Sequence, residues 1–183
     1  RSDTMILFTI DPLSKTAGMI SLPRDLWVNI PGFGYSRINT AYSSGEGNKL
    51  PGGGPGLAMK TVEQFPGVPI QYYAQVDFVA FEEAIDAMGG LEMCVPERIL
   101  VSVIGKEKKY PIKQGCHVYP GYLVLGYART RKTDGGDIDR AERQQLVIMA
   151  LRDQVFSPEN FPKMVSIAPD VYAEASVGLR TNL

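Results

Sequence analysis

The sequence predicts an α/β fold, a three-layer α-β-α sandwich with a central mixed β-sheet. Short apolar runs that end at Pro or Gly alternate along the chain with amphipathic stretches of helical period. Such alternation is typical of layered folds in which helices cover both faces of a sheet. The 183 residues suffice for one sizeable domain, 1–183, and the composition is globular, with 44% apolar and 21% charged residues.

The first part of the chain is expected to be mostly strand and loop. The expected strands, which are short apolar runs or alternating segments, are 5–12, 16–25, 26–32 and 70–78. Residues 37–56 are rich in Gly, Ser and Pro, so they predict a long loop with one helical turn at 39–43. A helix over 55–65 follows, with Pro55 near its first turn.

The second part alternates helices with strands. The expected helices are 78–90, which glycine closes, 120–130, 137–156 and a last short one at 157–172. Asp137 is the expected N-cap of the long helix. A strand is expected at 91–97, followed by a hairpin-like excursion over 97–115 and a loop-like stretch at 113–121.

Composition excludes several functions. The net charge of −1 argues against a general nucleic-acid binder, which usually carries a basic excess. Two cysteines and the single His117 are too few for a Cys/His zinc cluster, and His117 adjoins Cys116, an unsuitable spacing for a nucleophile and its base. The sequence contains no run of about 18 apolar residues, so no membrane span is predicted within it. Because the chain opens on a strand-like run and ends without a stop signal, we expect an excised domain.

The segment "ARTRKTDGGDIDRAERQQ", residues 128–145, concentrates guanidinium groups. If the long helix starts near Asp137, side chains at helical spacing form a stripe along one of its faces. The first half of this stripe is polar and the second half is apolar. Members of the stripe are Arg140, Gln144, Val147 and Leu151. A helix N-terminus favours anions, and Arg129 and Arg131 approach it from the preceding segment. The segment therefore predicts a clamp for a phosphate group, which guanidinium binds in bidentate fashion.

The alternative for this segment is an exposed face with Arg–Asp pairs such as Asp139–Arg143. A second cluster favours the clamp, because Arg24 and Asp25 follow a buried strand and ligands of open α/β sheets gather at strand ends. Asp3 precedes the first strand. A carboxylate near phosphates suits Mg²⁺, which typically takes one or two carboxylates plus phosphate oxygens.

Five motifs occur in order along nearly the whole chain: "RSDTM" (1–5), "SLPRD" (21–25), "RINTAY" (37–42), "YARTR" (127–131) and "GDIDRAERQQ" (136–145). On these motifs the sequence resembles the LytR–CpsA–Psr family of bacterial cell-wall enzymes. The resemblance implies an extracytoplasmic domain on a membrane anchor that lies outside this chain. It also implies transfer of a glycopolymer from a polyprenyl-pyrophosphate carrier to peptidoglycan, with Mg²⁺ as cofactor.

The resemblance assigns roles to residues of the matching motifs. Asp3 would approach the metal. The expected pyrophosphate clamp consists of Arg24, Arg129, Arg131 and Arg140, with Gln144 orienting a phosphate or its water. Further residues assigned to the site are Asp25, Asp137 and Arg37. The general base could be Asp25 or Asp137, or the reaction could need none. The family carries a further metal-side aspartate on an upstream strand, and this chain starts after that strand.

A lipid carrier would need an apolar tunnel, with its mouth at Arg24, Arg129 and Arg140. The side chains expected to line it are Leu57, Val62, Phe65, Phe78, Phe81, Ile85, Val147 and Leu151. The alternative is that these residues are ordinary core, which packs at crystal-like density with few voids.

An extracytoplasmic location also predicts a disulfide between Cys94 and Cys116, because thiols outside the cytosol pair readily. The alternative is two buried free thiols.

Two other functions remain open at this point. The same arginines would serve a polyprenyl-pyrophosphate hydrolase, with water in place of the sugar hydroxyl. A non-catalytic regulator that binds polyprenyl phosphates would also use them. The expected partners are the lipid-linked glycopolymer, peptidoglycan and the membrane surface, without nucleic acid.

Overall fold

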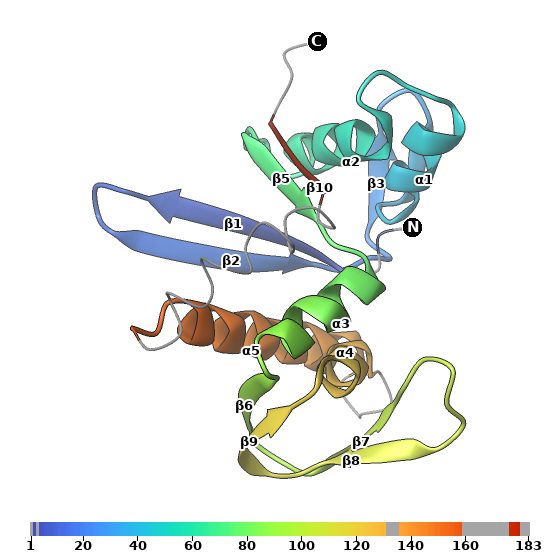
Figure 1. Ribbon diagram of the computed structural model, residues 1–183. Helices are drawn as coiled ribbons and strands as arrows, with labels where there is room; N and C mark the ends of the chain where they lie inside the picture. Colours follow the sequence, from blue (N-terminus) through green and yellow to red (C-terminus); the bar gives the residue numbers. More distant parts are fainter. Residues whose placement is uncertain (1, 3, 131–135, 159–175, 180–183) are drawn as a thin grey trace. The chain divides into compact units, whose positions relative to one another are not determined.

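The computed structural model describes the chain except for residues 1, 3, 131–135, 159–175 and 180–183. The protein is a mixed α/β fold of two compact units (Figure 1). Each unit has its own apolar core. The first unit comprises Arg1–Ala74 with Val177–Leu183, and the second comprises Gln75–Ser176. Among the helices of the described part, none is both long and apolar enough to cross a membrane.

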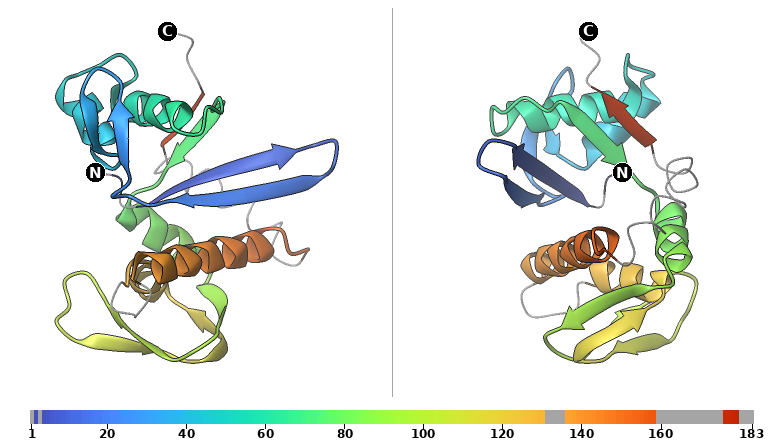
Figure 2. Two further views of the ribbon diagram at one scale, coloured as in Figure 1. Left: turned by 180° about the vertical axis from the view of Figure 1, so that it is seen from behind. Right: turned by 60° about the vertical axis from the view of Figure 1, so that its left-hand side comes forward.

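The first unit consists of two hairpins, a pair of helices and a further strand pair. In chain order its elements are β1 (Met5–Asp11), β2 (Thr16–Leu22), β3 (Trp27–Ile30), β4 (Gly34–Arg37), α1 (Thr40–Gly47), α2 (Gly53–Gln64), β5 (Tyr72–Gln75) and β10 (Ser176–Leu179). β1 pairs antiparallel with β2, and β3 with β4. β10, from the far end of the chain, pairs with β5. The β1–β2 hairpin is the long blue ribbon of Figure 2.

One carboxylate fixes the turn between β1 and β2. Asp11 accepts a hydrogen bond from the Leu13 N–H at 2.9 Å and another from the Ser14 hydroxyl at 2.6 Å. The Ser14 hydroxyl, followed by the backbone N–H groups, lowers the pKa of the Asp11 carboxyl below its usual value. Asp initiates turns through bonds of this kind. The turn sets the register that pairs Met5 with Leu22 and leads β2 directly to Pro23 and Arg24.

α1 and α2 approach closely because glycine stands at their contact. A Cβ atom on Gly54 would lie 2.6 Å from the Tyr42 carbonyl oxygen, which no side chain tolerates. The Gly54 N–H donates to the Glu46 carboxylate at 2.7 Å. The long loop expected at 37–56 was wrong, since this stretch forms α1 and the start of α2. Its glycines serve close helix contact rather than a loop.

The core of the first unit lies between the β3–β4 hairpin and the helix pair. Its buried members are Val28, Ile30, Ile38, Ala41, Leu57 and Val62. Burial alternates along β3, where Val28 and Ile30 point inward and Trp27 and Asn29 outward, as expected of a strand with one buried face.

The second unit packs helices against two antiparallel strand pairs. Its elements are α3 (Phe78–Ala87), β6 (Leu91–Val95), β7 (Ile99–Ser102), β8 (Lys109–Ile112), β9 (Gly115–Tyr119), α4 (Gly121–Arg129) and α5 (Asp137–Val155). β6 pairs with β9, and β7 with β8. The Asp77 side chain caps α3 by accepting a hydrogen bond from the Ala80 N–H at 2.9 Å.

The core of the second unit is the larger of the two. Its buried members are Ile85, Leu91, Met93, Val95, Val101, Ile112, Tyr119, Val124, Tyr127 and Val147. α5 contributes to this core through Val147, so the helix that begins with the arginine-rich segment is held by packing in its middle turns. Burial of one aliphatic side chain stabilises by about 1.5–3 kcal/mol, and Leu146, Ala150 and Leu151 of the same helix also pack against the core.

Two further expectations differ from the structure. The N-cap of α5 is Gly136, with φ 58°, and Asp137 is the first helical residue. The stretch 113–121 contains the strand β9 rather than a loop, because its residues complete the pairing with β6.

The expected helix at 157–172 lies largely outside the described residues. The described strands form five two-stranded sheets, so the single central sheet remains a prediction.

Candidate functional site

In the first unit, two arginines flank one carboxylate directly after β2. The Asp25 carboxylate lies 3.4 Å from the Arg24 Nε and 3.4 Å from an Arg37 guanidinium nitrogen. Arg24 is half-buried, whereas Asp25 and Arg37 are exposed. An aspartate between two guanidinium groups orients both of them, so Asp25 has a positioning role here whether or not it also accepts a proton.

The backbone around Arg24 is fixed by the start of α1. The Asn39 N–H donates to the Arg24 carbonyl oxygen at 3.2 Å, and the Ile38 N–H donates to the Leu26 carbonyl oxygen at 2.8 Å. Asn39 is buried, with 3% of its surface exposed. Asn39 stands in the "RINTAY" motif, and its contact with Arg24 could not be predicted from the sequence. That motif therefore supports the "SLPRD" arginine from the neighbouring segment.

In the second unit, the C-terminal end of α4 presents Arg129. The Arg129 guanidinium carbon lies 4.7 Å from the centroid of the Phe78 ring, a cation–π contact that orients an exposed arginine. The Thr130 hydroxyl donates to the Gly126 carbonyl oxygen at 2.8 Å and closes the last turn of α4. Phe78, expected to line the lipid tunnel, thus contacts the proposed phosphate clamp directly.

The first turns of α5 hold this end of α4. An Arg143 guanidinium nitrogen donates to the Thr130 carbonyl oxygen at 2.6 Å, and the Gln144 amide donates to the Ala128 carbonyl oxygen at 3.3 Å. Arg143 and Gln144 are 7% and 8% exposed. The alternative of an exposed face does not hold for Arg143, which is buried and donates to the Thr130 carbonyl group at the end of α4. Gln144 supports α4 in addition to the ligand role expected for it.

Arg140 stands in the N-terminal turn of α5 and is 7% exposed. Its own N–H donates to the Gly136 carbonyl oxygen at 3.3 Å, the first bond of the helix. The helix N-terminus and the guanidinium group both carry positive charge, so together they favour an anion at this end. The stripe expected from the sequence is confirmed as an inward face, since Gln144 and Val147 are also buried and Leu151 packs against the core.

Beside this stripe the second unit has a hollow of about 270 Å³. Its lining residues are Pro96, Glu97, Ile99, Tyr127, Asp139, Glu142, Arg143 and Leu146. Burial raises the pKa of the Tyr127 phenol above its usual value, Arg143 opposes the rise and Glu97 adds to it, so the phenol is neutral at pH 7. With three carboxylates in its wall, this hollow does not fit an apolar chain.

The remaining expected site residues divide between the units. Asp3 and Arg131 lie outside the described residues, as does the Asp137 side chain. Of the expected tunnel residues, Leu57 and Val62 belong to the core of the first unit, whereas Phe65 is exposed. Those in the second unit that join or pack against its core are Phe81, Ile85, Val147 and Leu151. The tunnel remains a prediction.

The expected disulfide is confirmed. Cys94 on β6 and Cys116 on β9 are directly opposite in the register, with Cα atoms 3.9 Å apart, and they form a disulfide. The bond links the two strands that carry Met93 and Tyr119 into the core. It thus supports the strand β6, against which α5 packs.

Replacing both cysteines with serine is expected to lower the free energy of unfolding by about 3–3.5 kcal/mol, because the bond closes a loop with a sequence separation of 22 residues. Denaturant unfolding of the oxidised protein and the Cys94→Ser/Cys116→Ser variant measures the difference. Thiol titration of the unfolded, unreduced protein is the control. Two reactive thiols per chain would contradict the disulfide.

Arg143→Ala is expected to lower the free energy of unfolding by about 1.5–3 kcal/mol, since it removes a charged donor from the Thr130 carbonyl group. It is also expected to loosen Arg129, one residue before that carbonyl group. Thermal unfolding and activity of the variant, with Arg143→Lys as a control that retains the charge, separate the two effects. Equal stability of the wild type and Arg143→Ala would show that the bond is dispensable.

In the first unit an arginine follows a strand end, and in the second unit arginines stand at a helix C-terminus and in the first turn of a helix. Each position suits an anionic ligand of a mixed α/β fold. The sequence pattern of the LytR_cpsA_psr family matches residues 1–183. The chain therefore belongs to the LytR_cpsA_psr family, as its five ordered motifs indicate.

Individual relatives agree with this membership. TagT of Bacillus subtilis (strain 168), called polyisoprenyl-teichoic acid–peptidoglycan teichoic acid transferase, is 35% identical over 164 residues, which cover 88% of this chain and 48% of TagT. The chain thus spans about half the length of this curated relative. The crystal structure of B. subtilis TagV matches with a TM-score of 0.82 and 34% identity, covering 98% of this chain and 67% of TagV.

A structure of TagT bound to LI-WTA matches with a TM-score of 0.70 and 30% identity over 98% of this chain and 64% of that one. Both structural matches extend over nearly all of this chain. The mixed α/β architecture is therefore common to this protein and these relatives.

Proposed function

We propose that this chain is the catalytic part of a phosphotransferase that moves a glycopolymer from a polyprenyl-pyrophosphate carrier to peptidoglycan. The observation that carries the proposal is the burial of Arg140 in the N-terminal turn of α5. The next turn of α5 donates hydrogen bonds to the C-terminal end of α4, where Arg129 lies. Family membership supports it, and so does the name of the TagT relative, matched over about half its length.

The proposed reaction is a phosphoryl transfer. A sugar hydroxyl oxygen of peptidoglycan forms a bond to the sugar-side phosphorus of the carrier. The bond from that phosphorus to the bridging oxygen breaks, polyprenyl phosphate leaves, and the hydroxyl proton is released. Such chemistry needs mainly positioning and neutralisation of phosphate charge, which arginines supply.

This chain's residues would divide those tasks. Arg24, Arg129, Arg131 and Arg140 would hold the pyrophosphate oxygens and neutralise the charge that develops on the leaving group. Gln144 would orient a phosphate oxygen while its amide nitrogen keeps α4 in place. Either Asp25 or Asp137 would serve as the general base. No general base would be needed if the sugar hydroxyl is sufficiently acidic.

Mg²⁺ is the proposed cofactor. Within the described residues no group of three or more His, Cys, Asp or Glu side chains is arranged to hold a metal ion. Mg²⁺ nevertheless suits this site, because one or two carboxylates suffice when phosphate oxygens complete its shell. Asp25 is engaged by Arg24 and Arg37. Asp3 is the carboxylate that we assign to the ion, because its "RSD" motif matches that of the family. When bound, Mg²⁺ supplies positive charge to the pyrophosphate.

The proposal includes the surroundings of the site. We assign the chain to the extracytoplasmic face of a bacterial membrane, anchored through a segment outside it, where the disulfide is chemically stable. We further propose a three-layer sandwich in which the strand pairs join one central mixed sheet, with an apolar tunnel for the polyprenyl chain. Insertion of the chain would gain roughly 0.8 kcal/mol per methylene.

Turnover of a polyprenyl-pyrophosphate-linked sugar, measured with and without peptidoglycan, tests the proposal. A transferase releases polyprenyl phosphate much faster when peptidoglycan is present. Equal release in both reactions would identify a hydrolase instead. Binding of the substrate without release would identify a non-catalytic regulator.

A further inference from the structure

The β7–β8 hairpin carries a local excess of positive charge. Residues 98–113 contain five basic side chains and one acidic one, whereas the rest of the chain contains fourteen basic and nineteen acidic residues. The basic residues of the hairpin, all exposed, are Arg98, Lys106, Lys108, Lys109 and Lys113. Lysines gathered on one hairpin of an otherwise acidic chain form a surface for an anionic partner.

The same hairpin exposes apolar side chains among its lysines. Val101 and Val103 are buried, whereas Leu100 on β7 and Ile104 in the turn after it are 47% and 53% exposed. Pro111 lies directly opposite Leu100 in the register and is also exposed. The outward face of the hairpin is therefore both apolar and cationic.

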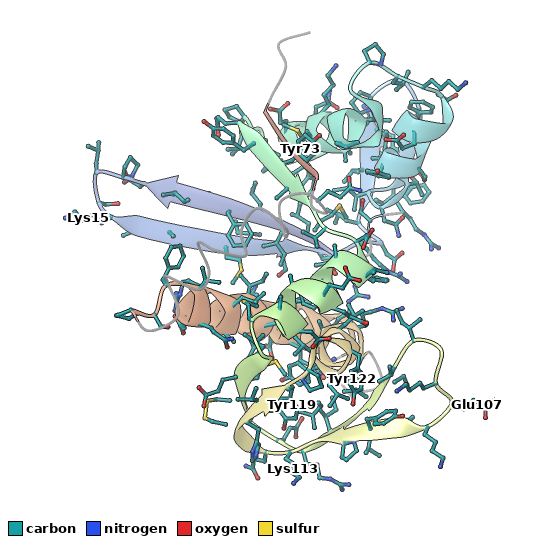
Figure 3. The ribbon with its side chains drawn as sticks, viewed as in Figure 1. Lys15, Tyr73, Glu107, Lys113, Tyr119 and Tyr122 are labelled. Carbon is teal, nitrogen blue, oxygen red and sulfur yellow. A yellow bond between two sulfur atoms is a disulfide. The ribbon has the colours of Figure 1, made fainter. Side chains whose placement is uncertain are left out.

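The loop at the end of the hairpin is ordered by aromatic contacts. The Lys106 ammonium lies 5.4 Å from the Tyr110 ring centroid and 5.0 Å from that of Tyr122 on α4. The two rings meet edge to face with centroids 6.1 Å apart. Figure 3 shows Tyr122 beside the hairpin, Glu107 at the end of the loop and Lys113 at the far end of β8. Tyrosine, lysine and aliphatic side chains together are typical of surfaces at a membrane–water interface.

We propose that the outward face of residues 98–113 docks onto an anionic phospholipid bilayer. The lysines contact lipid phosphates, and Leu100 and Ile104 enter the boundary between headgroups and acyl chains. The exposed aliphatic side chains favour a bilayer over a soluble polyanion, because a polyanion gives them no apolar environment. Each lysine near an anionic surface contributes about fivefold to vesicle binding.

This docking goes beyond the proposed function and is separable from it. It would hold the domain at the surface in which a polyprenyl carrier resides, yet it requires neither the carrier nor the arginine clamp. Vesicles without polyprenyl lipids therefore measure docking alone, and Arg140→Ala is expected to bind them as the wild type does. Transfer activity without vesicle binding would overturn docking and leave the proposed function intact.

Co-sedimentation of the 183-residue chain with vesicles of phosphatidylcholine and about one third phosphatidylglycerol is the first test. We expect binding that falls with added salt and is absent from pure phosphatidylcholine vesicles. Lys108→Glu/Lys109→Glu is expected to weaken binding at least about 25-fold. The matched control is Lys15→Glu/Lys60→Glu, with two exposed lysines of the first unit, and it should retain more of the binding. Equal loss in both double variants would overturn the proposal.

A tryptophan reporter tests insertion. Trp27 is the only tryptophan of the chain, so Ile104→Trp in a Trp27→Phe background gives one signal from the hairpin. Docking predicts a blue shift of its emission with anionic vesicles and quenching by lipids with brominated acyl chains. Circular dichroism confirms that the variants are folded. An unchanged spectrum with vesicles, or equally tight binding to soluble poly(glycerol phosphate), would show that the hairpin does not insert into a bilayer.

Discussion

Arg140→Ala is expected to lower kcat/KM for glycopolymer transfer about tenfold to a hundredfold, because it removes a charge-assisted bond to a phosphate worth about 1.5–3 kcal/mol. Arg140 is buried in the N-terminal turn of α5, where the positive charge of the helix N-terminus and that of the guanidinium group would act on the same anion. Arg24→Ala, Arg129→Ala and Arg131→Ala should each have an effect of the same order. Steady-state kinetics, with thermal unfolding of each variant, measure activity and stability separately.

The matched control for these variants is Arg152→Ala. Arg152 lies in the last turn of α5, and its exposed guanidinium group donates to the carboxylate of its neighbour Asp153 at 2.6 Å. Its loss is expected to leave activity unchanged, since surface pairs contribute little. If Arg140→Ala and Arg152→Ala had equally mild effects on kcat/KM, the phosphate clamp would be wrong.

Removal of divalent cations is expected to abolish turnover, and added Mg²⁺ is expected to restore it. The pyrophosphate carries several negative charges that repel an incoming oxygen, and a divalent cation neutralises them. Turnover measured in excess chelator, then with Mg²⁺ added back, tests the requirement. Asp3→Ala is expected to raise the Mg²⁺ concentration needed for half-maximal activity.

Glu107→Ala, at the exposed end of the β7–β8 loop, is the matched control for Asp3→Ala. It should leave the Mg²⁺ dependence unchanged. Full activity in excess chelator would remove both the metal and Asp3 from the site.

Most helices and strands of the described chain could be predicted from periodicity and from Pro and Gly. α3, α4, α5 and the β7–β8 hairpin lie where the sequence places them. The stretch 37–56 could not be predicted in this way, because glycine marks a loop and a close helix contact equally well, and only the Gly54 contact with Tyr42 distinguishes them. β9 was missed since its partner β6 precedes it by some twenty residues, as the Cys94–Cys116 separation of 22 indicates.

The site could be predicted in its residue types and less well in its supports. The stripe through Arg140 and Gln144 follows directly from helical spacing. The burial of Arg143 could not be predicted, because its partner is the backbone carbonyl group of Thr130. Every residue has such a group, so the sequence does not indicate which one binds an arginine. The same holds for the Asn39 N–H on the Arg24 carbonyl oxygen and for Phe78 beneath Arg129. These supports depend on tertiary contacts alone.

The most direct test of the proposed transfer is mass spectrometry of peptidoglycan fragments after incubation with a polyprenyl-pyrophosphate-linked sugar. Attack at the sugar-side phosphorus predicts a fragment in which the sugar is joined to peptidoglycan through one phosphate, and an equal amount of polyprenyl monophosphate. Peptidoglycan that carries no phosphate-linked sugar, while sugar phosphate accumulates in solution, would contradict transfer and identify water as the acceptor.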